Sequence, residues 1–135
     1  MSMKRILLTG ANGFVGNYFL KKYSSSYKII TFSFLNDNFA NLDLSNIDVV
    51  IHCSALVHQM KEASWELYEK INIDQTIQLA DKAKKSGVKH FIFLSTIKVY
   101  GEESNKCYYE NSRTNPTDYY SVSKLKAEDS IRNIE

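Results

Sequence analysis

Three side chains in the second half of the chain, Thr96, Tyr120 and Lys124, have the types needed for proton transfer. Tyr120 and Lys124 stand four residues apart, which places them on the same face of a helix. A free tyrosine has a pKa of about 10, but a neighbouring ammonium favours the phenolate. With Thr96 orienting the same oxygen, Tyr120 could exchange a proton with a substrate hydroxyl or carbonyl. Such pairs also occur by chance on many helices.

Three glycines near the amino terminus, Gly10, Gly13 and Gly16, separate an apolar run from a helical pattern. A helix amino terminus carries unpaired N–H groups and about half a positive charge, which suits a pyrophosphate. Gly10 would serve the tight turn, Gly13 the close approach to phosphate, and Gly16 the packing of helix on strand. The spacing is G-x-x-G-x-x-G, and glycines also mark ordinary turns. The position between a strand and a helix favours dinucleotide binding.

The region after the second strand normally supplies the residue that reads the adenosine ribose. An acid there suits a 2′-hydroxyl, and an arginine suits a 2′-phosphate. Residues 33–37 contain no arginine and one acid, Asp37. The sequence therefore favours NAD and leaves NADP open.

Strand and helix patterns alternate along the chain. Apolar and β-branched runs predict strands over residues 4–9, 27–33, 47–53 and 89–95. Helical spacing predicts helices over residues 13–24, 64–86 and 117–134. This alternation indicates an α/β fold with a parallel sheet, whose ligand lies beyond the carboxyl ends of the strands.

Composition indicates one globular domain. The 135 residues are 44% hydrophobic, and the net charge of +2 argues against nucleic acid or an anionic membrane as a partner. No apolar run reaches the roughly 18 residues of a membrane helix, and no signal peptide is evident. The two cysteines lack disulfide or metal-site spacing, so a reduced cytoplasmic location and no metal are expected. The histidines His52, His58 and His90 have no partner motif and are expected to be structural.

In order and spacing, the motifs resemble the extended short-chain dehydrogenase/reductases, and specifically the NAD-dependent epimerase/dehydratase family acting on nucleotide sugars. The matching stretches are Thr9-Gly10-x-x-Gly13-Phe14-x-Gly16, Ile51-His52-Cys53-Ser54-Ala55, Asn72-x-x-x-Thr76, Gly87-Val88-Lys89-His90-Phe91, Leu94-Ser95-Thr96 with Val99-Tyr100-Gly101, and Pro116-x-x-x-Tyr120-x-x-x-Lys124. Residues 56–60 and 95–99 look most like UDP-sugar 4-epimerases and UDP-4-keto-6-deoxy-N-acetylhexosamine reductases of bacterial surface-polysaccharide synthesis.

The resemblance implies a Rossmann-type doubly wound parallel sheet with residue roles at the matching positions. Thr96 would be the catalytic hydroxyl, Tyr120 the acid/base, and Lys124 the residue that lowers the tyrosine pKa and binds the nicotinamide ribose. Asn72 occupies the family's helix position behind the active site. The expected cofactor-binding residues are Gly10, Asn12, Gly13, Phe14, Val15 and Gly16 at the pyrophosphate, Asp43 and Leu44 by the adenine, Ser54, Ala55 and Leu56 along the dinucleotide path, and Asn72, Tyr120 and Lys124.

In such enzymes the nicotinamide takes hydride from sugar C4 while tyrosine takes the hydroxyl proton, which gives a 4-keto intermediate. Re-reduction from the other face gives the epimer, and reductases run only the return step. The implied substrate is a nucleotide sugar, with a UDP-sugar favoured.

Two features depart from the family pattern. Ser54 and Thr96 replace an alanine and a serine, and threonine keeps the hydroxyl. Family members also continue past the Tyr-x-x-x-Lys helix into a carboxy-terminal substrate lobe. We therefore expect residues 1–135 to form a partial NAD(P)-binding domain without that lobe, with an exposed sheet edge and possible homodimerisation. The alternative is a non-catalytic dinucleotide-binding module or an inactive remnant.

Overall fold

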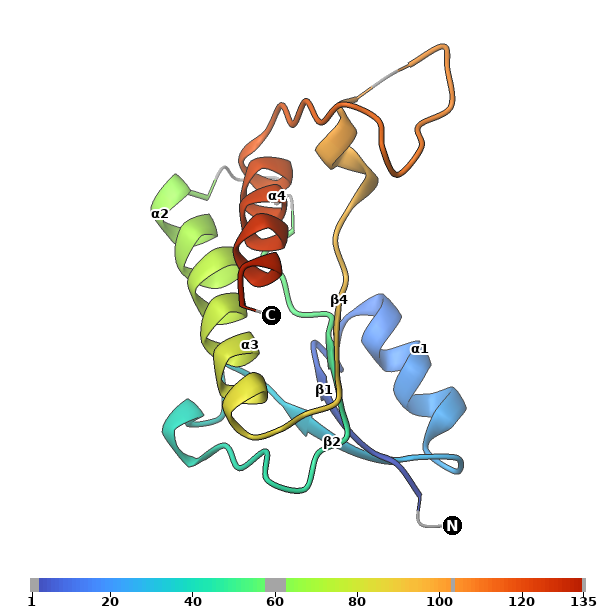
Figure 1. Cartoon of the computed structure of the whole chain (residues 1–135), viewed down its shortest axis with the longest axis vertical. Coiled ribbons are helices and arrows are strands. Elements are labelled where there is room, and N and C mark those ends of the chain that lie inside the picture. Colours follow the sequence, from blue (N-terminus) through green and yellow to red (C-terminus); the bar gives the residue numbers. More distant parts are fainter. Residues whose placement is uncertain (1–2, 58–62, 103, 135) are drawn as a thin grey trace.

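The computed structural model describes residues 3–57, 63–102 and 104–134. Strands and helices alternate in it, as the sequence predicts (Figure 1). In chain order the elements are β1 (Arg5–Thr9), α1 (Phe14–Tyr23), β2 (Lys28–Phe32), η1 (Phe39–Asn41), β3 (Val49–His52), α2 (Trp65–Tyr68), η2 (Glu69–Asp74), α3 (Gln75–Lys85), β4 (His90–Phe93), η3 (Ile97–Tyr100) and α4 (Tyr119–Arg132).

The four strands form one parallel sheet in the order β2-β1-β3-β4. Leu7 of β1 pairs with Ile30 on one side and Val50 on the other. The expected α/β class with a parallel sheet is confirmed. Because β2 lies on one side of β1 and β3 on the other, the winding direction reverses between β1 and β3. In such sheets this reversal is where ligands bind, outside the carboxyl ends of the strands.

Helices cover both faces of the sheet. Successive side chains of a strand point to opposite faces, so each strand packs against helices on both sides. On one face, Leu7 and Val50 pack with Leu79 of α3, and all three are fully buried. On the other face, Ile6 and Leu8 pack against side chains of α1. Figure 1 shows α1 on one side of the strands, with α2, α3 and α4 on the other. The fold is thus doubly wound, and each fully buried leucine contributes about 1.5–3 kcal/mol to the free energy of folding.

The helix expected over residues 64–86 has the predicted extent but a different interior. It consists of α2, the π-helical segment η2 and α3. The helix ends at Lys85, and Gly87, two residues further on, has a φ of +75°. The π segment buries Asn72 and Ile73, and α4 packs beside it. Within the described residues, no helix combines the length and apolar character that crossing a membrane requires.

Candidate functional site

The glycine turn after β1 lies directly at the winding reversal. Gly10 has a φ of +71°, in the left-handed region, and a Cβ there would stand 2.7 Å from the Cys53 carbonyl carbon. Gly16 is buried, and a Cβ there would stand 2.2 Å from the Gly10 carbonyl oxygen. The turn therefore packs backbone to backbone against both α1 and the end of β3, which side chains would prevent.

The amino terminus of α1 is left open to an anion. Gly13 is the N-cap, so no side chain caps the helix, and the first turn carries no acidic residue. Asn12, Phe14 and Val15 are exposed. Phe14 belongs to the apolar pattern of the helix in the sequence, yet at the first position of α1 it is 93% exposed. These features fit a pyrophosphate.

The backbone that follows β3 is held by side chains from two other elements. The Ser54 N–H donates to Thr9 Oγ1 over 3.3 Å. The Leu56 N–H donates to Asn72 Oδ1 over 2.7 Å, and Asn72 Nδ2 donates to the Leu56 carbonyl over 3.0 Å. Ala55 lies between these two anchors. The expected dinucleotide path, residues 54–56, is therefore fixed next to the Gly10 turn.

The residues expected near the adenosine are only partly placed to contact it. Leu44 is 1% exposed and packs in the core, so only its backbone could face a ligand. The Asp43 carboxylate is exposed and accepts bonds from the Ser45 backbone and hydroxyl, which lower its pKa. Asp37 uses one carboxylate oxygen to accept the Ser33 N–H over 2.7 Å. Its exposed position after β2 remains compatible with reading a ribose hydroxyl.

A directed hydrogen-bond chain through His52 connects β1, β3 and the long helix. The Thr76 hydroxyl donates to the Asn72 carbonyl over 2.8 Å, so it accepts from His52 Nε2 at 2.9 Å. Nδ1 of His52 then accepts from the Thr9 hydroxyl at 2.6 Å, which assigns the Nε2–H tautomer. Burial lowers the pKa of His52 to about 3, so the imidazole is neutral. The sequence predicts a structural role for His52, but no motif in it predicts this tautomer or these two hydrogen-bond partners.

The same network reaches the helix that carries the tyrosine. Asn72 Nδ2 also donates to Ser123 Oγ over 2.9 Å, and the Ser123 hydroxyl donates to the Tyr120 carbonyl over 2.8 Å. Asp118 caps α4 in a reciprocal pair with Ser121. The first turn of α4 is therefore anchored from behind and from its own start.

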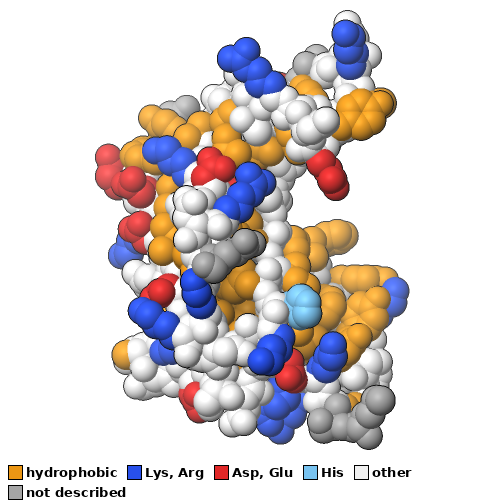
Figure 2. Space-filling view, in the orientation of Figure 1, with side chains coloured by type: hydrophobic (Ala, Val, Ile, Leu, Met, Phe, Trp, Pro, Cys, Tyr) orange, Lys and Arg blue, Asp and Glu red, His pale blue; other side chains and the backbone are white. Residues whose placement is uncertain are grey.

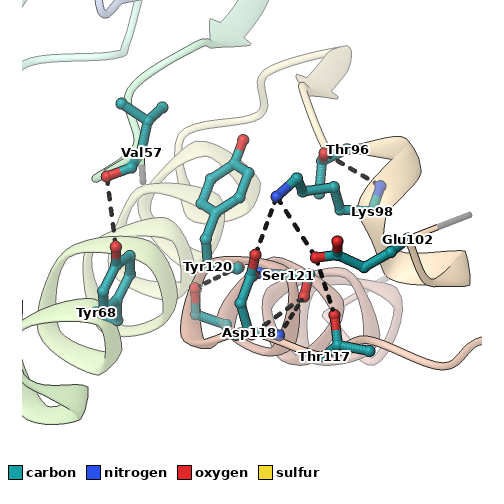
Figure 3. Close-up of polar contacts among 10 residues, drawn as sticks. Val57, Tyr68, Thr96, Lys98, Glu102, Thr117, Asp118, Tyr120 and Ser121 are labelled. Atoms are coloured by element: carbon teal, nitrogen blue, oxygen red, sulfur yellow. Dashed lines mark hydrogen bonds and ion pairs between the residues drawn. The ribbon is translucent and has the colours of Figure 1, made fainter. Parts of the chain in front are cut away.

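Tyr120 lies half-buried beside the Thr96 end of η3 (Figure 3). Burial raises the pKa of its hydroxyl, while a hydrogen bond with Thr96 and the charge of Lys98 act to lower it. That Lys124 supplies this positive charge stays a prediction. Its Nζ lies 3.9 Å from the centroid of the Phe93 ring, on the inner face of α4 toward β4.

Lys124 is 2% exposed, and burial lowers its pKa to about 8. Glu128 and Cys53 oppose that shift, which places the ammonium close to the end of β3. The Gly10 turn touches the same Cys53 backbone. Lys124 and the Gly10 turn therefore both lie near the end of β3, and the ammonium carries hydrogen-bond donors.

The structure thus brings the glycine turn, the segment after β3, Thr96, Tyr120 and Lys124 to the carboxyl edge of one sheet. Figure 2 shows the outline hollowed on this side, between α1 and the segment that follows η3. His58, Gln59 and Met60, part of the stretch used for the finer family placement, lie outside the described residues.

Comparisons with known proteins concern the family and the fold of the chain. The sequence profile described as the NAD dependent epimerase/dehydratase family matches residues 6–135. A UDP-glucose 4-epimerase of Vibrio cholerae is 36% identical over 148 residues, which cover 93% of this chain and 45% of that protein.

Among solved structures, a UDP-glucuronic acid 4-epimerase from Bacillus cereus in complex with NAD has a TM-score of 0.82 and 28% identity, over 96% of this chain and 52% of that one. A dTDP-4-dehydrorhamnose reductase from Bacillus anthracis in complex with NADP shares the fold, with a TM-score of 0.82 and 23% identity, over 100% of this chain and 51% of that one. The chain spans about half the length of these relatives. It belongs to the NAD dependent epimerase/dehydratase family.

Proposed function

We propose that this chain is the cofactor-binding part of an NAD-dependent nucleotide-sugar enzyme that works at sugar C4, as a 4-epimerase or a 4-keto-sugar reductase. The observation that carries this assignment is the meeting of the glycine turn with Thr96, Tyr120 and Lys124 at one edge of the sheet. A UDP-sugar is the proposed substrate class, because the Vibrio cholerae relative is a UDP-glucose 4-epimerase. NAD is proposed over NADP, because Asp37 is the acid that follows β2.

Three parts of the chain are proposed to hold the dinucleotide. The turn from Gly10 to Gly16 and the open start of α1 would hold the pyrophosphate. Residues 54–56 would line the path toward the nicotinamide, and Lys124 would bind its ribose. When bound, the nicotinamide supplies an acceptor and donor of hydride.

The chain's own part in the chemistry is to move and orient a proton. Tyr120 would take the proton of the sugar C4 hydroxyl and return it to the same oxygen on the reverse step. The Thr96 hydroxyl, on the η3 side of Tyr120, would orient that oxygen. The half-buried position of Tyr120 limits access of water to the transferred proton.

Cofactor binding is tested by titrating the protein with NADH and with NADPH and following nicotinamide fluorescence. We expect saturable binding with a lower Kd for NADH, because the region after β2 offers an acid and no arginine. Absence of saturation with either dinucleotide would contradict the cofactor assignment.

Tyr120→Phe tests the chemical role. We expect turnover of a UDP-hexose to fall by about 10²- to 10⁴-fold while the Kd for NADH stays within about twofold, because only the transferred proton is lost. Tyr109→Phe, in an exposed loop, is the matched control and keeps full turnover. Full activity of the Tyr120 variant would remove the tyrosine from the mechanism.

A dinucleotide-binding module without catalysis is the second candidate, favoured by the coverage of only about half of each relative. It predicts the same NADH binding with no turnover of any UDP-hexose by the unmodified chain. An inactive remnant predicts neither binding nor turnover.

A further inference from the structure

A lysine from η3, Lys98, lies beside the Tyr120 side chain (Figure 3) and pairs with Asp118 at the start of the tyrosine's own helix. Lys98 Nζ stands 3.1 Å from Asp118 Oδ2 and 4.0 Å from Glu102 Oε1. Figure 3 shows the Lys98 side chain crossing from η3 toward the tyrosine ring, with its ammonium between Asp118 and the phenol. The ammonium is thus held close to the proposed acid/base group.

The partner of Lys98 has two tasks, one for each carboxylate oxygen. Asp118 Oδ1 accepts the Ser121 N–H over 2.7 Å and so caps α4. The other oxygen, Oδ2, accepts from Lys98. Tyr120 stands in the first turn of this helix. The ion pair, by holding the N-cap residue, therefore helps to fix the position of the tyrosine side chain.

The turn that carries Lys98 also carries the second hydroxyl of the site. Thr96 is the N-cap of η3, and its Oγ1 accepts the Lys98 N–H over 3.3 Å. This short contact fixes the spacing of the two residues, so η3 presents a hydroxyl and an ammonium to Tyr120 from the same side. This arrangement differs from that of Tyr120 and Lys124, which share one face of a single helix.

We propose that Lys98 is a positioning residue for Tyr120: its bond to Asp118 sets the start of α4 and holds a second ammonium, besides that of Lys124, on the η3 side of the tyrosine. The role depends on the proposed function of Tyr120 as the acid/base.

The charged and titratable groups around Tyr120 act in opposite directions. Burial is the largest influence and raises its pKa, and Asp118 and Tyr68 raise it further. Thr96 and Lys98 lower it. Glu102 pairs with Lys98 and so acts on Tyr120 indirectly. The pKa of Lys98 itself is raised, chiefly by its hydrogen bond to Asp118. Removing Lys98 would therefore take away one of the influences that lower the pKa of Tyr120.

The test is a titration of the tyrosine hydroxyls by NMR, in protein labelled with ¹³Cζ-tyrosine, with Tyr120→Phe used to assign the Tyr120 signal. We expect Lys98→Met to raise the pKa of Tyr120 by about 0.5 to 1, since the charge is partly screened by solvent. Lys98→Arg restores the unmodified value. Asp118→Asn shifts the pKa in the opposite direction, and asparagine still caps the helix.

Lys126→Met is the matched control: Lys126 is an exposed lysine of α4 whose ammonium lies over the Trp65 ring, 4.7 Å from its centroid. It leaves the Tyr120 titration unchanged. Thermal unfolding of each variant identifies changes that come from loss of folding. A Lys98→Met variant that is folded and titrates within about 0.2 of the unmodified protein would overturn the role of Lys98. Because the titration needs no cofactor, substrate or turnover, its outcome is independent of whether the chain proves to be an enzyme.

Discussion

His52 shows how much a single buried side chain can specify. Both ring nitrogens are bonded, to Thr9 and to Thr76, and the imidazole is completely buried at the end of β3. Protonation would turn the acceptor Nδ1 into a donor facing a hydroxyl that already donates to it. The folded state therefore excludes the charged form, which the pKa of about 3 expresses.

This shift predicts a pH dependence of stability. The pKa of His52 falls from 6.5 in the unfolded chain to about 3 in the fold. The unfolded state therefore binds an extra proton between these values, and the free energy of unfolding falls as pH decreases through that window. Each pH unit costs up to about 1.4 kcal/mol. Urea unfolding at a series of pH values between 7 and 4 measures the slope, which is absent above the unfolded pKa.

The matched comparison is His52→Gln against His90→Gln, since His90 is exposed on β4. We expect the first variant to lose most of the slope and the second to keep it. In the unmodified protein, the His52 ring proton should not shift between pH 5 and pH 8 in an NMR titration. A titration of that signal near neutral pH would show that the imidazole is not sealed in the fold.

Residue types could be predicted from the sequence more readily than residue contacts. The positions of Gly10, Thr96 and Tyr120 follow from motifs, because each motif is tied to the end of a strand or the start of a helix. The neighbour of the tyrosine does not: Lys124 shares its helix face, yet the side chain turns inward to Phe93. The pair of Lys98 with Asp118 joins positions 20 residues apart through a loop whose path no local pattern encodes.

At the scale of elements, the packing of α1 on the glycine turn leads to a sharp prediction. Alanine at position 16 gains about 1 kcal/mol of helix propensity over glycine. Its Cβ would stand 2.2 Å from the Gly10 carbonyl oxygen, a contact that forces α1 away from the turn. We expect Gly16→Ala to lower the free energy of unfolding by about 1–3 kcal/mol and to weaken NADH binding at least about tenfold.

Gly87→Ala is the control. A Cβ at Gly87 meets nothing within 4 Å, but its φ is +75°, so this substitution costs about 1–2 kcal/mol of backbone strain alone. Its NADH affinity stays at the unmodified value. Urea unfolding and NADH fluorescence on the two variants separate lost stability from a displaced turn, and wild-type affinity in Gly16→Ala would contradict the packing argument.

The sequence predicts the strands and the long helices correctly, but it does not predict the short or irregular elements. All four strands and the long helices were predicted, since their apolar spacing extends over several turns or pairs. The π segment Glu69–Asp74 was not, because the burial of Asn72 and Ile73 depends on α4 packing across the helix. The short turns η1 and η3 each begin at a local side-chain cap, Asn38 or Thr96, which accepts the N–H two residues further on.

For the whole molecule, the sheet is covered unequally on its two faces. Ile92 of the edge strand β4 pairs in register with Ile51, so both face the α1 side. Ile51 is 9% exposed, whereas Ile92 is 46% exposed, because α1 packs over the neighbouring strands. Figure 2 shows apolar surface beside α1 in this part of the molecule. The exposed edge expected from the sequence is present at β4.

We predict that this edge makes the isolated chain self-associate with rising concentration. An edge strand with unpaired backbone groups and an apolar side chain is a template for pairing. Ile92→Lys should shift the mass measured by light scattering toward the 15.5 kDa monomer. Ile97→Lys, which adds the same charge to an exposed position of η3, should leave the association unchanged. Equal masses for all three proteins at all concentrations would exclude this interface.

The side chain of Asn72 does for Leu56 what a neighbouring strand would do. Its amide oxygen accepts the Leu56 N–H, and its amide nitrogen donates to the Leu56 carbonyl. One side chain thus makes the pair of backbone hydrogen bonds that a neighbouring strand would make after the end of β3. The segment after β3 is thereby tied to the long helix at both polar groups of one residue. Loss of the Asn72 amide would release the backbone at Leu56 from that helix.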